Sequence, residues 1–186
     1  MRQIVHLDGI TEHFTFVETD ARPRPAVERD VRATLDGAID VGLITRRLNA
    51  SEVQEALRVI PVGRDAVVFA AHPDVGIENV SSEELLDIYS GRRHTFADGS
   101  PVTVLLRDRG ESANLAIDVG IPGMAGVREQ AGRLGFRVLY HDDAMAAALA
   151  VTPGAIGVYA YGLLRETRIP LKVLKLDGRT PSRQTL

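Results

Sequence analysis

Short apolar runs alternate with helical segments along this chain, and this alternation constrains the fold more than any other feature. The runs typical of strands cover residues 14–17, 39–45, 66–71, 102–106, 136–140, 155–161 and 171–176. Segments with helical spacing or capping signals lie between them, at 23–35, 52–59, 82–89, 112–119, 124–134 and 144–151. Strands joined through helices pair in parallel, because a parallel connection needs a crossover. The order therefore predicts an α/β fold with mostly parallel sheets.

The starts of several expected helices carry capping signals. Ser81 and Glu84 have the spacing of a capping box, in which the hydroxyl and the carboxylate each accept a backbone N–H. Ser51 is placed to cap an earlier helix. Asp142 or Asp143 is placed to cap a later one, where negative charge also compensates the helix dipole. We prefer this interpretation of the two acids over metal binding or acid–base catalysis.

The composition excludes several classes of protein. The 186 residues are 45% hydrophobic, which is enough for one folded domain or two small lobes. A formal net charge of −3 argues against nucleic acid or an anionic membrane surface as a partner. The absence of cysteine excludes disulfides and thiolate chemistry, and the five histidines are too scattered to form a metal site. The sequence has neither a nucleotide-binding glycine loop nor a nucleophile elbow, so it predicts no enzyme.

Residues 105–114 have the composition of an anion-binding turn. Arg107 stands at the end of an expected strand, Gly110 follows in a turn, and Ser112 and Asn114 stand at a helix start. A helix N-terminus offers unpaired N–H groups and partial positive charge, and arginine adds a forked set of donors. This arrangement predicts an oxyanion site at the carboxyl end of the strand. The ordinary alternative is an exposed strand end with Ser112 as a helix cap.

A second strand end carries similar chemistry. Thr45 and Arg46 follow the apolar run that begins at residue 39, and in open α/β sheets ligands lie at the carboxyl ends of strands. We expect Thr45 to donate a hydrogen bond to the ligand and Arg46 to line the same site. The alternative is a structural arginine paired with Asp40 or Glu52.

Five segments, in the same order along the chain, resemble the substrate-binding proteins of phosphate-type ABC transporters. These proteins have the type 2 periplasmic-binding fold. Residues 36–46 match the family pattern G-x-x-D-x-G-x-x-[ST]-R, and residues 152–159 are similar to T-P-G-A-I-G-Y. The other three segments are 61–68, 80–91 and 107–114. The order of all five makes the resemblance more specific than any one segment does.

The resemblance implies a two-lobed α/β fold with mostly parallel sheets. Lobe 1 would contain residues 1–66 and 158–186, lobe 2 would contain residues 67–157, and the ligand would lie between them. The implied function is binding of a small oxyanion as the solute-binding component of ABC-type uptake. Phosphate is the first candidate, and sulfate, molybdate and tungstate are the others. An ABC transporter permease is the implied protein partner, and neither a cofactor nor a metal is expected.

The same resemblance implies an extracytoplasmic location, either periplasmic or anchored to a membrane. The sequence itself shows no apolar leader after Met1 and no run long enough to span a membrane. We therefore expect a mature or trimmed chain if this implication holds, and a cytoplasmic protein otherwise.

Three departures from the family pattern concern the anion site. Only residues 1–12 precede the first expected strand, so we expect the family's first strand and its anion-binding loop to be absent, leaving the N-terminal unit shortened. The next loop contains Thr19 and Asp20, where the family often has a Gly-Ser pair. Asp20 suits a protonated oxyanion, because a carboxylate can accept the proton of the anion. Glu111 stands beside Ser112 where many relatives have Ser-Gly.

These departures leave a second hypothesis open. The chain would then be a regulatory or sensory ligand-binding module of the same fold that has lost anion binding. A missing strand leaves an exposed sheet edge, and such an edge favours pairing with a second copy. A homodimer is therefore expected under this hypothesis.

Overall fold

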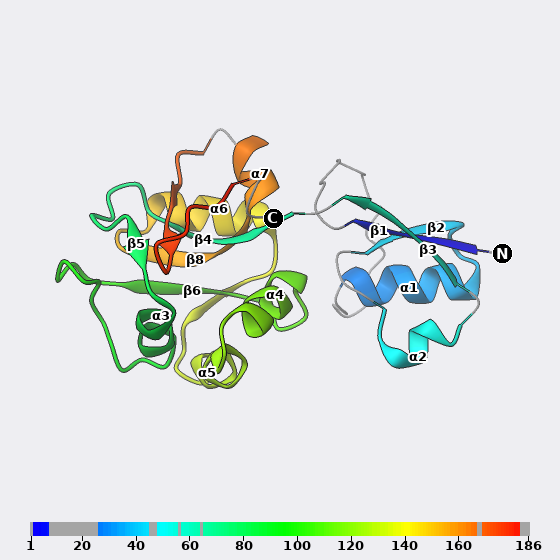
Figure 1. Ribbon diagram of the computed structural model, residues 1–186, viewed down its shortest axis with the longest axis horizontal. Helices are drawn as coiled ribbons and strands as arrows, with labels where there is room; N and C mark the ends of the chain where they lie inside the picture. Colours follow the sequence, from blue (N-terminus) through cyan, green and yellow to red (C-terminus); the bar gives the residue numbers. More distant parts are fainter. Residues whose placement is uncertain are drawn as a thin grey trace. The chain divides into compact units, whose positions relative to one another are not determined.

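The computed structural model describes residues 2–7, 26–44, 48–55, 57–63, 65–166 and 169–182. The chain divides into two compact units, Met1–Asp65 and Ala66–Leu186 (Figure 1). The strand expected at 14–17 lies outside the described residues. So do four of the predicted site residues, namely Thr19, Asp20, Thr45 and Arg46. The described part of the predicted site is therefore confined to the second unit.

The first unit contains a three-stranded parallel sheet. Its strand order is β2-β1-β3, with β1 (Arg2–Leu7) hydrogen-bonded to β2 (Val41–Ile44) and to β3 (Leu57–Gly63). Helix α1 (Ala26–Asp36) contacts both β1 and β2 and so packs on this sheet. Val31 of α1 and the last residue of β2 are buried together in a small core.

Strand β1 lies ahead of the first strand that the sequence predicts, at 14–17. Ile4 and Val5 are β-branched and favour an extended backbone, but they lie in a run of only six residues. The strands that pair with β1 follow much later in the chain, beginning at Val41 and Leu57. Local sequence therefore does not reveal the pairing that stabilises β1.

The helix expected at 52–59 is much shorter in the structure. Helix α2 covers only Ala50–Val53, and its N-cap is Asn49 rather than Ser51. The Asn49 side chain accepts two backbone N–H groups of the helix start, each at 3.0 Å. The residues that follow form β3 instead, where Pro61 lacks the N–H that a helix would need.

A five-stranded mixed sheet forms the centre of the second unit, in the order β7-β6-β8-β4-β9. Its strands are β4 (Val67–Ala71), β6 (Thr103–Arg107), β7 (Arg137–Leu139), β8 (Ala155–Ala160) and β9 (Lys172–Val173). Strand β6 is parallel to β7 and β8, whereas β4 is antiparallel to β8 and β9. A separate parallel pair joins β5 (Asn79–Val80) to β10 (Lys175–Leu176). Across both units, strand pairing is mostly parallel, as the sequence predicts.

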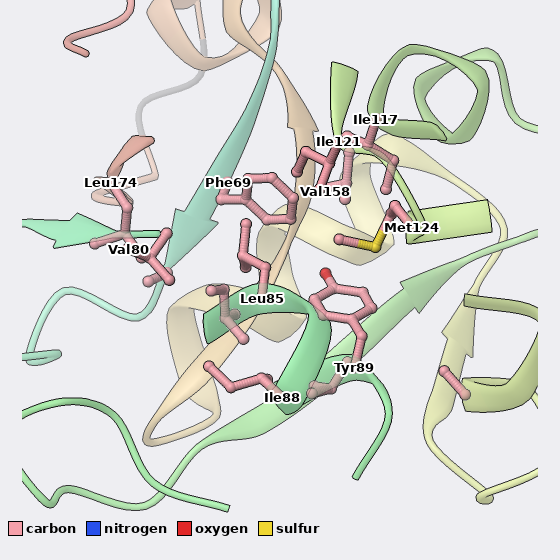
Figure 2. Close-up of a cluster of buried hydrophobic side chains, with 14 of the residues drawn as sticks. Phe69, Val80, Leu85, Ile88, Tyr89, Ile117, Ile121, Met124, Val158 and Leu174 are labelled. Carbon is pink, nitrogen blue, oxygen red and sulfur yellow. The ribbon is translucent and has the colours of Figure 1, made fainter. Parts of the chain in front are cut away.

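Helices cover both faces of this sheet (Figure 1). One face carries α3 (Ser82–Tyr89), α4 (Ser112–Gly120) and α5 (Met124–Ala131), and the other carries α6 (Asp142–Val151) and α7 (Tyr161–Glu166). Successive strand residues point to opposite faces. Leu106 therefore joins the core with α3, α4 and α5, and Leu105 joins the core with α6. Figure 2 shows the first core, in which the ring centroids of Phe69 and Tyr89 lie 6.2 Å apart, edge to face.

The capping box predicted at Ser81 is confirmed. The Ser81 hydroxyl accepts the N–H of Glu84 at 3.1 Å, and the Glu84 carboxylate accepts the N–H of Ser81 at 3.0 Å. Asp177, far along the chain, also binds this helix start, because its carboxylate accepts both the N–H and the hydroxyl of Ser82. The turn after β10 is thereby held against α3.

The C-terminal segment differs from the sequence-based division, which assigned residues 158–186 to the first lobe. Strand β8 runs across residue 158 and pairs with β4 and β6 of the second unit. Strands β9 and β10 pair with β4 and β5 of the same unit. The boundary between the units accordingly falls after Asp65, and the described residues beyond 158 belong with the second unit.

Candidate functional site

Arg107 is the last residue of β6, at the carboxyl edge of the second sheet. Because strand residues alternate, its side chain points to the same face as Leu105, which packs with α6. The Arg107 side chain is only 3% exposed, which is uncommon for a charged group. The strand end is therefore buried, in contrast to the exposed end of the ordinary alternative.

Two helices begin at the same edge of the sheet. Strands β6 and β7 are parallel neighbours, so the helices that follow them start on the same side, α4 at Ser112 and α6 at Asp142. The N-cap residues are Glu111 and His141, and within the described structure neither side chain caps its helix. Both helices thus direct the positive ends of their dipoles toward the edge where Arg107 lies.

Arg107 is paired with two carboxylates of the chain itself. Its Nη2 lies 3.1 Å from Glu111 Oε2 and 3.1 Å from Asp142 Oδ1. The two acidic side chains are 33% and 48% exposed, so the carboxylates remain in contact with solvent. Nη1 is buried and has no hydrogen-bond partner among the described residues. The protein therefore satisfies the guanidinium only in part. A buried donor left without a hydrogen bond costs about 1–3 kcal/mol.

The other predicted residues of this segment lie in the turn after β6 and in the first turn of α4. Gly110 is exposed, and its N–H lies 3.5 Å from a carboxylate oxygen of Asp108. Ser112 is half-buried at the first position of α4. Asn114 is buried, and its amide nitrogen donates to the Asp108 carbonyl at 2.6 Å. This bond of Asn114 holds the shape of the turn.

Three residues of this edge were not among the predicted site residues: Glu111, Asp142 and Tyr159. Burial is the main cause that raises the pKa of Tyr159, and the carboxylates of Asp142 and Asp143 raise it further. The positive charge of Arg107 acts in the opposite direction. The Tyr159 hydroxyl therefore stays protonated at neutral pH. Glu111 is only four residues from Arg107 along the chain, but the two are joined by a turn rather than a helix, so the helical i,i+4 rule does not predict their pairing.

Asp142 and Asp143 lie in the first turn of α6, where their charges are favourable to the helix dipole. The predicted cap is wrong in detail, because His141 occupies the N-cap position. In the described part of the chain, no three His, Asp or Glu side chains gather as metal ligands do. Among the helices of the described residues, none is both long and apolar enough to cross a bilayer.

A sheet with helices on both faces and a buried arginine beside two helix starts has the architecture of a small-ligand binding domain. A family model of the PBP superfamily domain matches residues 30–176. The chain belongs to the PBP superfamily. A search of curated proteins finds no significant match.

Solved structures share this fold. A protein from Clostridium perfringens, described as a phosphate ABC transporter substrate-binding protein with bound phosphate, has a TM-score of 0.66 and 14% identity over 84% of this chain. PstS from Borrelia burgdorferi has a TM-score of 0.57 and 13% identity over all of this chain and 81% of its own. An ABC-type phosphate transport receptor from Vibrio cholerae has a TM-score of 0.55 and 12% identity over 86% of this chain and 65% of its own.

The chain spans 63% of the length of the Clostridium protein. At 12–14% identity, these structures show a shared fold and no more. They confirm the predicted α/β, periplasmic-binding-protein-like fold. The Clostridium protein is described as a substrate-binding protein and the Vibrio protein as a transport receptor.

Proposed function

We propose that the chain binds a small oxyanion, phosphate first, as the solute-binding component of an ABC-type uptake system. The observation that carries the proposal is the burial of Arg107 at the carboxyl edge of β6, beside the starts of α4 and α6. Family membership supports a ligand-binding role. The phosphate bound to the Clostridium protein of the same fold supports phosphate as the first candidate.

The anion would exchange its hydration shell for donors that the fold holds in place. Arg107 offers a planar, always-charged fork suited to an oxyanion. The N–H groups at the starts of α4 and α6 add donors at the positive ends of two helix dipoles. Ser112 contributes its hydroxyl and Gly110 a backbone N–H, while Asn114 keeps the turn in shape.

Residues of the first unit are proposed as further ligands on the family resemblance alone. Thr19 and Thr45 would donate hydroxyls, and Arg46 would supply a second guanidinium. Asp20 would accept a hydrogen bond from the hydroxyl of a protonated oxyanion. This favours hydrogen phosphate over sulfate, molybdate and tungstate, which carry no proton near neutral pH.

An ABC transporter permease is the proposed protein partner, and an extracytoplasmic location is proposed with it. Family membership and the descriptions of the Clostridium and Vibrio proteins support both. Co-purification of the chain with a co-expressed ABC transporter permease tests this partner. Failure to co-purify in the presence of phosphate argues against it.

Titration calorimetry with phosphate and with sulfate at low salt tests the binding site. We expect the wild type to bind phosphate, and R107K to bind it about tenfold more weakly or worse, because lysine keeps the charge but loses the fork. R109K is the matched control, since Arg109 is an exposed arginine in the same turn, and its binding should equal that of the wild type. Absence of binding by the wild type, or equal binding by folded R107K, refutes the proposal.

A second candidate function is favoured by the pairing of Arg107 with carboxylates of the chain itself. A guanidinium paired permanently in this way would leave the fold without an anion site, as in a regulatory or sensory module. This candidate requires that the wild type does not bind phosphate and that it self-associates. Light scattering over a concentration series measures the mass, and a monomer at every concentration argues against self-association.

A further inference from the structure

We propose that Glu111 is a displaceable internal ligand of Arg107, which a bound oxyanion must replace. The proposal rests on the oxyanion binding proposed above and adds a residue that sets its affinity. The Glu111 carboxylate takes the Nη2 group of Arg107 that an oxyanion would otherwise bind. Removal of this carboxylate should therefore strengthen anion binding rather than weaken it.

The exposure of the three charged side chains supports the displacement of a carboxylate by the incoming anion. The Arg107 side chain is 3% exposed, whereas Glu111 is 33% and Asp142 is 48% exposed. Nη1 of Arg107 is buried as well. An anion arriving from solvent therefore meets the carboxylates before it meets the guanidinium. Direct contact with Nη2 requires one carboxylate to move.

Glu111 is the carboxylate that can move with the smaller loss. It occupies the N-cap position of α4, yet within the described residues its side chain makes no capping hydrogen bond. Serine, threonine, asparagine and aspartate are the residues preferred at an N-cap. The contact with Arg107 therefore accounts for the position of the Glu111 side chain better than the helix does. Its departure from Arg107 breaks no helix cap.

The helix dipoles favour a negative charge at both positions, because Glu111 is the N-cap residue of α4 and Asp142 lies in the first turn of α6. Glu111 differs in having one more rotatable bond, so its carboxylate can turn away from Arg107 while its backbone stays in place. Arg107 with both carboxylates has a net charge of −1, which repels an anion. Arg107 with Asp142 alone is neutral, so neutralising Glu111 removes that repulsion and also frees a donor.

Titration calorimetry with inorganic phosphate on the full chain tests the proposal. E111Q removes the charge and keeps the size of the side chain, and E111S places a preferred N-cap residue at the start of α4. The control is E129Q, because Glu129 also pairs with an arginine four residues away, Arg133 at 3.3 Å, but on an exposed surface. We expect E111Q and E111S to bind phosphate about tenfold more tightly than the wild type, and E129Q to equal it.

The outcomes separate this proposal from the proposed function. If the wild type binds phosphate and both folded Glu111 variants bind it no more tightly, the internal ligand is overturned and oxyanion binding stands. If only the Glu111 variants bind, the internal ligand is supported and phosphate binding by the wild type is refuted. If no variant binds, both are overturned. An equal gain in E129Q overturns the specific role of Glu111, because any loss of negative charge would then suffice.

Discussion

Replacement of Arg107 by methionine tests whether this arginine serves to bind a ligand or to stabilise the fold. Methionine retains a long side chain on the α6 face of the sheet but removes the guanidinium and both of its ion pairs. If Arg107 mainly stabilised the fold, its loss would leave two carboxylates without a partner and weaken the protein. If Arg107 serves a ligand, the fold should lose little, because the guanidinium is buried and only partly satisfied.

The expected magnitude follows from opposing contributions. Removal of the buried unsatisfied Nη1 should stabilise the fold by about 1–3 kcal/mol. Loss of the pairs with Glu111 and Asp142 should cost about 0–1 kcal/mol each, because both carboxylates are a third to a half exposed and therefore screened. We expect the free energy of unfolding of R107M to equal that of the wild type or to exceed it by about 1 kcal/mol.

Urea denaturation followed by circular dichroism measures this difference. The matched control is R128M, because Arg128 binds Asp118 through Nε at 3.2 Å and Nη2 at 2.7 Å, with both side chains only 16% exposed. R128M leaves the mostly buried Asp118 carboxylate without this partner and should lose about 1–3 kcal/mol. A loss of about 2 kcal/mol or more in R107M, similar to that of R128M, would refute the reasoning and make Arg107 a structural residue.

Two further predictions concern the stability of the second unit, at the turn that contains Gly154 and at the contact of Asp177 with the start of α3. Gly154 has φ 69° and a Cβ there would collide with the Pro101 carbonyl, so G154A should lose more than about 1 kcal/mol in urea denaturation. G99A is its control, because Gly99 has φ 84° but open space around it, and should lose less. The hydroxyl of Ser82, and after it the N–H of Ser82, lower the pKa of Asp177. The Asp177 carboxylate therefore stabilises the fold at pH values above the ordinary Asp pKa, and this stabilisation is lost as the pH falls through the lowered pKa. D177N should therefore melt below the wild type at neutral pH and together with it in acid; equal melting at both pH values contradicts this.

Features that depend on a few neighbouring residues could be predicted from the sequence. The capping box needs only Ser81 and Glu84, three positions apart, and both of its hydrogen bonds are present. The strand and helix on either side of the Arg107 turn were expected at 102–106 and 112–119, within one residue of their bounds in the structure. Apolar runs and caps of this kind carry their own signal, because the interactions they encode are local.

Features that depend on the pairing of distant strands could not be predicted in the same way. Strand β1 was missed because its hydrogen-bond partners, β2 and β3, follow much later in the chain. Asp142 reaches Arg107 because β7 pairs with β6, and Tyr159 comes close because β8 pairs with β6 on the other side. No local pattern in the sequence indicates which strands become neighbours. The sequence therefore does not predict which charged residues lie next to Arg107.

The state of the Arg107 guanidinium decides between an anion site and a structural ion pair. A structural arginine in a buried position should have its donors satisfied by the protein, because each unsatisfied one weakens the fold. Arg107 shares Nη2 between two carboxylates, while Nη1 has no partner within the described residues. An oxyanion presents several acceptor oxygens on one compact group, so it can satisfy donors that two tethered carboxylates leave unpaired. The proposed oxyanion would therefore satisfy the guanidinium more fully than the two carboxylates do, and the R107M measurement tests this explanation against a role in stability.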